Sequence, residues 1–390
     1  IPSVTIKTFT SYNSEKDFLE LTITDSDKII SKIQQKFDSE IKIAINQPKL
    51  WTPENPFLYD LEINLISKGK IIDVVKTYFG MRKISIRKDI NGTKRLHLNN
   101  KQYFQFGTLD QGWWPDGLYT APSDDALKFD IIKTKEYGFN MIRKHVKVEP
   151  ARWYYHADRI GMLVWQDMPN PGKTNPPTWI RNKFFDGKEY IPSPEVEKNF
   201  MNEWKGIMDF LYSNPSIVCW VPFNEGWGQF NTIEITNWTK KYDPYRLVNP
   251  ASGGNHYKIG DITDVHNYPD PKMKFYDPER SNVLGEYGGI GLAIDGHLWQ
   301  KNKNWGYVKY SNSKEATDEY VNFGNQLFEM VPRGFSGAIY TQTTDVEGEV
   351  NGLMTYDRKI LKLDVERVKK INLKVISALP AKFIRIPPNL

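Results

Sequence analysis

Two hydrophobic patterns follow one another along the chain. From residue 1 to about 87, apolar and polar residues alternate with period two, as in 17–23, 40–45, 58–65 and 83–86. This alternation predicts short strands with one buried and one exposed face. Polar residues, Gly or Pro separate these segments, so the first part of the chain is predicted to form an antiparallel β-sandwich.

After Leu96 the pattern changes to apolar strands that alternate with amphipathic helices, such as 124–137 and 196–212. Repeated strand–helix units predict parallel strands with crossover helices, and about 290 residues fit an eight-stranded (β/α)8 TIM barrel. We therefore predict a multidomain chain with a sandwich at 1–88 and a barrel at 89–390. The barrel strands expected from the pattern are 140–143, 162–165, 217–220, 283–285 and 337–340.

Polar residues at the ends of these strands are the first candidates for a functional site, because barrel enzymes carry their chemistry at the carboxyl ends of the strands. This rule is independent of any family. It selects Arg143, His145, Gln166, Asp167, Asn224, Glu225, His266–Tyr268, Glu286 and Tyr340–Asp345.

Composition narrows the possible functions. The net charge of +5 is small and the Lys residues are scattered, which argues against a nucleic-acid partner. No apolar run is long enough for a membrane span, and the start at Ile1 lacks the pattern of a signal peptide. Aromatic residues make up 14% of the chain, which suits carbohydrate binding, although most of these rings are expected in the cores.

Glu225 and Glu286 are the proposed catalytic pair. Glycoside hydrolysis needs one carboxyl group that protonates the leaving oxygen and a second, ionised one on the opposite side of the sugar. Glu225 ends an apolar run between Asn224 and Trp227, a setting that favours a protonated acid, whereas glycines on both sides of Glu286 leave room for a ligand. An unpaired carboxylate at the end of a buried strand would be costly without a purpose.

Other reaction classes are disfavoured. No cluster has zinc-ligand spacing, no Gly-x-Ser-x-Gly segment occurs, and the single Cys219 lies in an apolar strand. We therefore expect no metal and no cofactor.

Several side chains near the pair are candidates for sugar binding. His266 and Tyr268 could bind a hydroxyl group or hold the nucleophile, although a purely structural His266 is the more common situation. The rings of Trp113, Trp114, Trp165 and Trp227 could wall the pocket, or could equally serve packing.

The same segments resemble those of glycoside hydrolase family 2, which includes β-galactosidases, β-glucuronidases and β-mannosidases. Residues 50–59 and 78–84 are similar to the end of that family's immunoglobulin-like sandwich, and 138–145, 214–226 and 285–289 to its barrel signatures. The resemblance covers nearly the whole chain.

The resemblance also implies roles for individual residues. Glu225 corresponds to the acid/base, Glu286 to the nucleophile, and Asn224 to the residue that binds the sugar 2-hydroxyl. It further implies that side chains near the sugar or the nucleophile include Arg143, His145, Asp167, Tyr268 and the segment 340–345.

Three departures from the family pattern bear on substrate and organisation. The family's N-terminal jelly-roll domain has no counterpart in this sequence. The Asn-x-Lys of glucuronidases is replaced by Asn351-Gly352-Leu353. Residues 161–167 resemble mannosidases, whereas 224–227 resemble galactosidases and glucuronidases.

We therefore predict a retaining exo-β-glycosidase, most similar to a β-galactosidase, with its two carboxyl groups about 5 to 5.5 Å apart. The predicted partner is an oligosaccharide or polysaccharide-derived glycoside. β-Mannosidase or β-glucuronidase specificity, an endo-acting glycanase and a non-catalytic carbohydrate-binding protein remain as alternatives. A periplasmic or secreted location is favoured by the resemblance alone, and the oligomeric state is left open.

Overall fold

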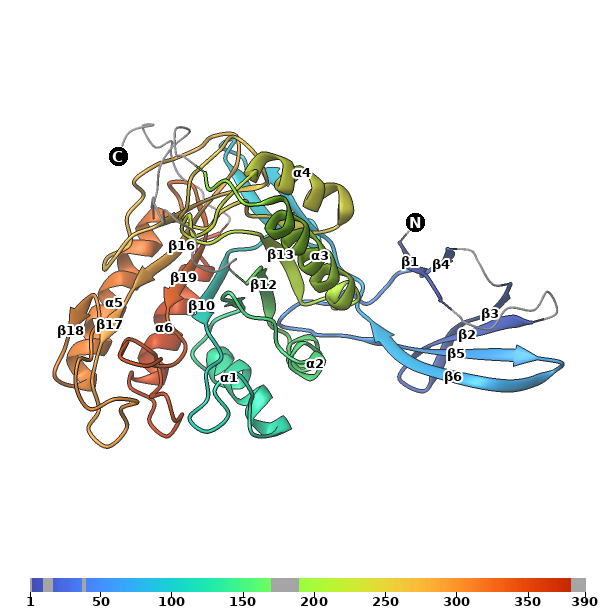
Figure 1. The fold of residues 1–390 in the computed structure, drawn as a ribbon, viewed down its shortest axis with the longest axis horizontal. Helices are drawn as coiled ribbons and strands as arrows, with labels where there is room; N and C mark the ends of the chain where they lie inside the picture. Colours follow the sequence, from blue (N-terminus) through green and yellow to red (C-terminus); the bar gives the residue numbers. More distant parts are fainter. Residues whose placement is uncertain (1, 10–16, 37–39, 170–188, 380–390) are drawn as a thin grey trace. The chain divides into compact units, whose positions relative to one another are not determined.

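The structure is a computed structural model, and it describes residues 2–9, 17–36, 40–169 and 189–379. The chain divides into two compact units. Unit 1 contains Ile1–Arg82 and Ser213–Pro215, and unit 2 contains Lys83–Tyr212 and Ser216–Leu390. Figure 1 labels many of the elements of both units.

Unit 1 is an antiparallel β-sandwich. Its larger sheet has the strand order β3-β2-β5-β6, and its smaller sheet pairs β1 with β4. The alternating burial predicted from period two is clear in β2, where Leu19, Leu21 and Ile23 are buried and pack with Ile41 and Ile43 of β4. The strand bounds are β1 Ser3–Ile6, β2 Phe18–Asp25, β3 Lys28–Gln35, β4 Ile41–Ala44, β5 Tyr59–Ser67 and β6 Lys70–Phe79.

Unit 2 is built on a parallel sheet of eight strands in the order β14-β13-β12-β11-β10-β19-β16-β15. The first and last strands of this order approach each other, because Asp261 N donates to Val248 O at 2.9 Å and Gly253 N to Asp264 O at 3.3 Å. The sheet therefore forms a nearly closed barrel (Figure 1). Its strands are β10 Gln105–Asp110, β11 Met141–Lys144, β12 Leu163–Asp167, β13 Ile217–Val221, β14 Leu247–Val248, β15 Ile262–His266, β16 Ser281–Gly288 and β19 Phe335–Thr341.

Helices cover the outside of the barrel (Figure 1). Side-chain caps begin four of them, because Ser123, Ser193, Asn312 and Asp364 each accept a hydrogen bond from a backbone N–H of the first turn. The connections from β14 to β15 and from β15 to β16, both fully described, contain no helix. The helices are α1 Asp124–Glu136, α2 Ala151–Ile160, α3 Pro194–Leu211, α4 Thr232–Tyr242, α5 Ser313–Met330 and α6 Val365–Ile376.

Three short strands precede the barrel in unit 2. β7 Ile84–Lys88, β8 Lys94–Leu98 and β9 Lys101–Gln102 form an antiparallel sheet. The alternating segment 83–86, expected in the sandwich, thus pairs with β8, whose Leu96 and Leu98 are buried. A parallel pair of two-residue strands, β17 Ile290–Gly291 and β18 Val308–Lys309, completes the unit.

The predicted sandwich followed by a TIM barrel is confirmed. The predicted helix at 124–137 corresponds to α1, and the strand at 217–220 to β13. The barrel strands expected from the pattern did not include β10, β15 or the two-residue β14. Among the described helices, none is long and apolar enough to cross a bilayer.

Candidate active site

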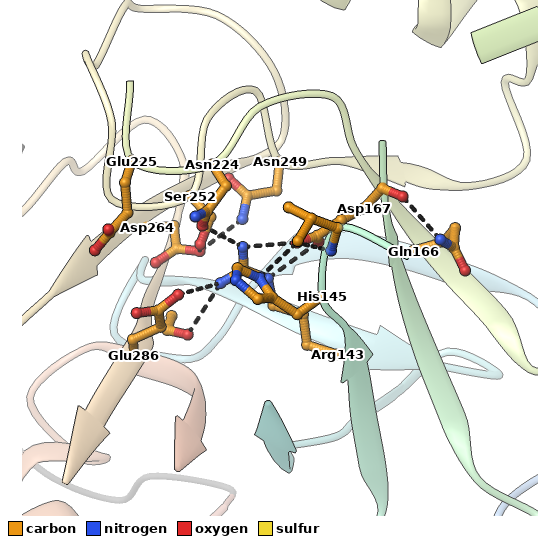
Figure 2. Close-up of polar contacts among 12 residues, drawn as sticks. Arg143, His145, Gln166, Asp167, Asn224, Glu225, Asn249, Ser252, Asp264 and Glu286 are labelled. Atoms are coloured by element: carbon orange, nitrogen blue, oxygen red, sulfur yellow. Dashed lines mark hydrogen bonds and ion pairs between the residues drawn. The ribbon is translucent and has the colours of Figure 1, made fainter. Parts of the chain in front are cut away.

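A buried guanidinium group organises the carboxyl end of the barrel. Arg143 at the end of β11 donates to both oxygens of Asp167, at 3.1 and 2.9 Å. It also donates to Asn224 Oδ1 at 2.6 Å and to Glu286 Oε1 at 3.2 Å. Figure 2 shows these four residues converging from separate strands and loops. These acceptors satisfy the N–H donors of a fully buried cation and fix the orientation of Glu286.

The charges around Arg143 stabilise one another. Burial would raise the pKa of Asp167, but Arg143 and His145 outweigh it, so this pKa is lowered. Burial alone would lower the pKa of the Arg143 guanidinium, and Asp167 and Glu286 more than compensate. His145 Nδ1 lies 3.2 Å from Asp167 Oδ2. Asp167 is therefore an anion that holds two basic side chains in place.

Glu225 and Glu286 meet at one imidazole ring. His266 Nδ1 lies 2.8 Å from Glu225 Oε1 and 3.2 Å from Glu286 Oε2. One oxygen of each glutamate and a ring nitrogen of His266 all lie within 4.8 Å of one another. Both carboxylates keep some solvent contact, with side-chain exposures of 15% and 7%. Glu225 from the turn after β13 and Glu286 from β16 thus face the same small space.

Glu225 has an unusual backbone conformation. Its φ of 53° lies in the left-handed region, and Gly226 continues the turn with a φ of 80°. The Glu225 N–H donates to Ser252 O at 2.7 Å, which holds the turn against the loop after β14. Strain of this kind in a non-glycine residue persists only where surrounding contacts determine it, and it is often found at functional sites.

Tyr268 supports Glu286 from the other side. Its hydroxyl donates to Glu286 Oε2 at 2.7 Å and lies 2.7 Å from Thr341 Oγ1. The ring stacks on Tyr307 with a centroid distance of 3.7 Å. Burial, together with the charge of Glu286, raises the pKa of Tyr268 well above its usual value. The hydroxyl therefore keeps its proton and remains a hydrogen-bond donor.

A second buried acid lies behind His266. Asp264 Oδ2 accepts from Ser252 Oγ and from Asn249 Nδ2, both at 2.6 Å, and Ser252 Oγ is 2.8 Å from His266 Nε2. Burial raises the pKa of Asp264 to about 7. The neighbouring strand must have glycine at position 285, since a Cβ there would come within 1.8 Å of Asp264 Oδ1.

A cavity of about 260 Å3 also opens at this end of the barrel. Its wall includes the ring of Trp113, which packs edge-on against the ring of Tyr119 with a centroid distance of 4.6 Å. The half-buried Glu349 lies in the same wall. The cavity residues are Gln111, Trp113, Trp305 and Val346–Glu349.

The structure brings together most of the residues predicted from the sequence. Eight of them are connected to one another by hydrogen bonds or ion pairs: Arg143, His145, Asp167, Asn224, Glu225, His266, Tyr268 and Glu286. Gln166 instead accepts from Tyr154 inside the barrel wall.

The predicted aromatic contacts divide into two groups. Trp113 lines the cavity, and Trp227 follows Glu225 with 44% of its surface exposed. Trp165 is buried and donates to Gln105, while Trp114 lies under Arg358. Tyr340 is fully buried and packs on Tyr287 and Tyr320.

Tyr340 is therefore a core residue in this structure, and we do not retain it as a sugar contact. Successive side chains of a strand point to opposite faces. On β19, Thr341 points toward Tyr268, so its neighbour Tyr340 points out toward α5.

Sequence reasoning did not select Asn249, Ser252, Asp264 or Glu349. A signal for Asp264 was present, because Asp264 and His266 are two residues apart on a strand and so share a face. Asn249, Ser252 and Glu349 lie in loops, where no periodicity indicates which side chains turn inward.

Comparisons with known proteins agree with this architecture. The family model "Glycosyl hydrolases family 2" matches residues 3–82, and "Glycosyl hydrolases family 2, TIM barrel domain" matches residues 93–372. A β-galactosidase of Lactococcus lactis is 28% identical over 260 residues, which are 65% of this chain and 24% of that protein. A β-glucuronidase of Bacteroides fragilis is 25% identical over 388 residues, covering 88% of this chain and 53% of that protein.

Solved structures show the same fold. A β-D-glucuronidase of Dictyoglomus thermophilum superposes with a TM-score of 0.73 at 18% identity, covering 98% of this chain and 69% of that one. A β-galacturonidase of Eisenbergiella tayi superposes with a TM-score of 0.66 at 17% identity, covering 95% and 68%. The chain spans about a quarter to a half of the length of the two curated relatives above.

Proposed function

The chain belongs to glycosyl hydrolases family 2, and on that premise we propose that it hydrolyses a terminal β-linked sugar with net retention of configuration. Glu286 is the nucleophile and Glu225 is the acid/base. The observation that carries the proposal is the separation of the two acids, whose facing oxygens lie within 4.8 Å of each other. Retaining glycosidases have carboxyl groups about 5 to 5.5 Å apart, whereas inverting enzymes need about 6.5 to 9.5 Å to admit a water molecule.

In the first step, a Glu286 carboxylate oxygen attacks the anomeric carbon, and the bond from this carbon to the leaving oxygen breaks. Glu225 gives its proton to the leaving oxygen. Arg143 and Tyr268 each hydrogen-bond to Glu286, at 3.2 and 2.7 Å, which stabilises its ionised form and aims it.

In the second step, Glu225 acts as a base. It takes a proton from water, the water oxygen bonds to the anomeric carbon, and the ester bond to Glu286 breaks. Two inversions at the same carbon give retention. His266 contacts both carboxyl groups and holds them facing the same small space in both steps.

Other side chains are proposed to bind the sugar. Asn224 accepts from Arg143 through Oδ1, which leaves its amide nitrogen as a donor for a sugar hydroxyl. His145 and Trp227 border the same end of the barrel, and Trp113 offers a ring face in the cavity. A β-galactoside is the proposed substrate, with β-mannosides and β-glucuronides as alternatives.

A panel of nitrophenyl β-glycosides tests this proposal. The wild type should release nitrophenol from at least one sugar, and Glu286→Ala should lose almost all of that activity. Glu203→Gln removes an exposed carboxylate from helix α3 and is the matched control, which should retain activity. Activity that survives Glu286→Ala would exclude Glu286 as nucleophile.

Two further outcomes identify the alternatives. Binding of a sugar without turnover by the wild type would favour a carbohydrate-binding protein. Internal fragments from an oligosaccharide, in place of released monosaccharide, would favour an endo-acting enzyme.

A further inference from the structure

His266 is linked to a buried acid on the side of its ring that faces away from the two glutamates. Its Nε2 atom lies 2.8 Å from Ser252 Oγ, and Ser252 Oγ donates to Asp264 Oδ2 at 2.6 Å. Asn249 donates to the same oxygen of Asp264, also at 2.6 Å (Figure 2). All four residues are buried. The mechanism above gives no role to Ser252 or Asp264.

Two glycines leave room for this chain of hydrogen bonds. A Cβ atom at Gly253 would overlap the ring of His266, and a Cβ atom at Gly285 would overlap the carboxyl group of Asp264. Gly253 also has a φ of 61°, in the left-handed region that favours glycine. The ring and the carboxyl group are thus packed against backbone, which restricts their rotation away from Ser252.

These hydrogen bonds determine which nitrogen of His266 carries a proton. The Ser252 hydroxyl has one proton and donates it to Asp264, so Ser252 Oγ can only accept from His266. The Nε2 atom of His266 therefore carries a proton. In a neutral ring the other nitrogen, Nδ1, then has a lone pair in place of a proton. Nδ1 is the nitrogen that faces the two glutamates.

A proton is needed between Nδ1 of His266 and the carboxyl groups. Nδ1 lies 2.8 Å from Glu225 Oε1 and 3.2 Å from Glu286 Oε2, and lone pairs at such distances repel one another unless a proton lies between them. Glu286 already accepts from Arg143 and Tyr268, which stabilise its ionised form. The proton therefore belongs to Glu225 and Nδ1.

We propose that Glu225 and His266 Nδ1 share one proton and act together as the acid/base. Ser252 and Asp264 are positioning residues, which keep the other ring proton on Nε2. This inference rests on the proposed glycosidase function. It assigns a task to two buried side chains that do not reach the sugar.

The shared proton leaves and returns once in each turnover. In the first step it bonds to the leaving oxygen, and its bond to Glu225 breaks. The Glu225 carboxylate then faces the Nδ1 lone pair of His266 without a proton between them, which makes the pair a stronger base. In the second step the pair takes one proton from water, the water oxygen bonds to the anomeric carbon, and the ester bond to Glu286 breaks.

Most of the charged groups around His266 keep one charge between about pH 5 and about pH 9. Burial lowers the pKa of His256 to about 3 and raises that of Tyr268 well above its usual value, so both side chains are neutral in this range. The titratable or charged groups that face His266, directly or through Glu286, are Glu225, Glu286, Asp264, His256, Arg143 and Tyr268.

Asp264 does titrate in this range, because burial raises its pKa to about 7. Its Oδ2 atom accepts from both Ser252 and Asn249, so the proton of the neutral form lies on Oδ1. Ionisation of Asp264 therefore leaves the direction of the hydrogen bond from Ser252 unchanged. The proton on Nε2 of His266 is held in place on both sides of pH 7.

The position of the ring proton can be measured without any assay of activity. Nitrogen NMR of protein with its six His residues isotope-labelled distinguishes protonated from unprotonated ring nitrogens, and comparison with His266→Gln identifies the His266 signals. In the wild type, Nε2 should stay protonated from about pH 5 to about pH 9, while Nδ1 loses its proton as the pH rises. Asp264→Asn keeps an oxygen acceptor for Ser252 and should give the same pattern. A neutral ring with its proton on Nδ1 would overturn the proposal.

The pH profile of kcat/KM tests the role of Ser252. Ser252→Ala removes the acceptor for Nε2, so a neutral His266 ring can place its proton on Nδ1, donate to Glu225 and stabilise the ionised form of this acid. The alkaline limb of the profile, which reports loss of the acid's proton, should move to lower pH by about one unit. An unchanged limb would overturn the proposal.

Ser216→Ala is the matched control for this substitution. Ser216 is also buried, and its hydroxyl has no hydrogen-bond partner among the described residues. Loss of this hydroxyl should leave both limbs of the profile where they are in the wild type. A shift equal to that of Ser252→Ala would show that the loss of any buried hydroxyl moves the limb, and would count against the role of Ser252.

The two measurements separate this inference from the proposed function. A ring that keeps its proton on Nε2 while Nδ1 titrates, in a chain without turnover, would support the shared proton and refute the glycosidase function. Turnover by a wild type whose neutral His266 ring has its proton on Nδ1 would support the glycosidase function and refute the shared proton. Where Ser252→Ala fails to fold, the wild-type spectrum decides alone.

Discussion

Replacing Asp264 with Asn should stabilise the protein relative to the wild type, and this gain in stability should increase as the pH rises. Burial raises the pKa of Asp264 to about 7, from an ordinary value of 3.8. The folded chain therefore keeps a proton that the unfolded chain has already lost, and its stability falls as the pH rises from about 4 through 7. A shift of this size corresponds to about 4 kcal/mol in total, of which about 2 to 3 kcal/mol falls between pH 5 and pH 8.

The substitution should remove this penalty with little change in shape. Asn resembles the protonated acid, and its oxygen can accept from Ser252 and Asn249 as Asp264 Oδ2 does. The other oxygen of Asp264 is buried and has no hydrogen-bond partner among the described residues. A buried oxygen without a partner costs less free energy in a neutral group than in an anion. The protonated form is thus consistent with the hydrogen bonds as well as with the pKa.

Urea unfolding followed by tryptophan fluorescence measures the effect. This signal reports chiefly the barrel, because Trp51 is the one tryptophan in the sequence of unit 1. The free energy of unfolding of Asp264→Asn, relative to wild type, should increase by about 2 to 3 kcal/mol from pH 5 to pH 8. A difference that stays constant over this range would show that Asp264 titrates normally and would refute the argument.

Asp167→Asn provides a control of opposite sign. Arg143 and His145 lower the pKa of Asp167, so its ionised form stabilises the fold at all pH values above its usual range. This stability is lost as the pH falls through the folded-state pKa. Asp167→Asn should therefore be destabilising at neutral pH and less so in acid.

Three further substitutions test individual contacts, and a fourth serves as a control. Tyr268→Phe removes the hydrogen-bond donor to Glu286 and should lower kcat/KM by about 10- to 100-fold in steady-state kinetics. A smaller effect would argue against a role of Tyr268 at the nucleophile. Arg143→Met leaves buried carboxylates without their counter-ion and should lower the free energy of unfolding by about 3 to 5 kcal/mol. A loss below about 1 kcal/mol would contradict the role of Arg143 in organising the site. Gly285→Ala would place a Cβ within 1.8 Å of a neighbouring side chain and should lower the melting temperature strongly. Gly206→Ala, in a helix with nothing within 4 Å, should be neutral or slightly stabilising.

Much of the architecture could be predicted because it depends on periodicity. The alternation in 17–23 reflects a strand with one buried face, and the apolar run at 217–220 a strand buried on both. β14 has only two residues, too few for any pattern. Segment 83–86 was recognised as a strand, but its partner depends on contacts that local sequence does not encode.

Site residues at the ends of strands could be predicted from the sequence, whereas site residues in loops could not. Arg143, Asp167 and Glu286 lie at or near strand ends, and the barrel topology alone brings these positions together. Tyr340 occupies a similar position, but its side chain points outward, a one-residue difference that the apolar segment did not resolve. Glu349 is in a turn, and only the folded loop places it beside the cavity.

The anomeric configuration of the first sugar released tests the central claim most directly. Proton NMR can record the product of a β-glycoside before mutarotation equilibrates the two anomers. With the facing oxygens of Glu225 and Glu286 within 4.8 Å, the account predicts that the β-anomer appears first. Initial appearance of the α-anomer would mean inversion, and would contradict the assignment of Glu286 as a nucleophile that bonds to the sugar.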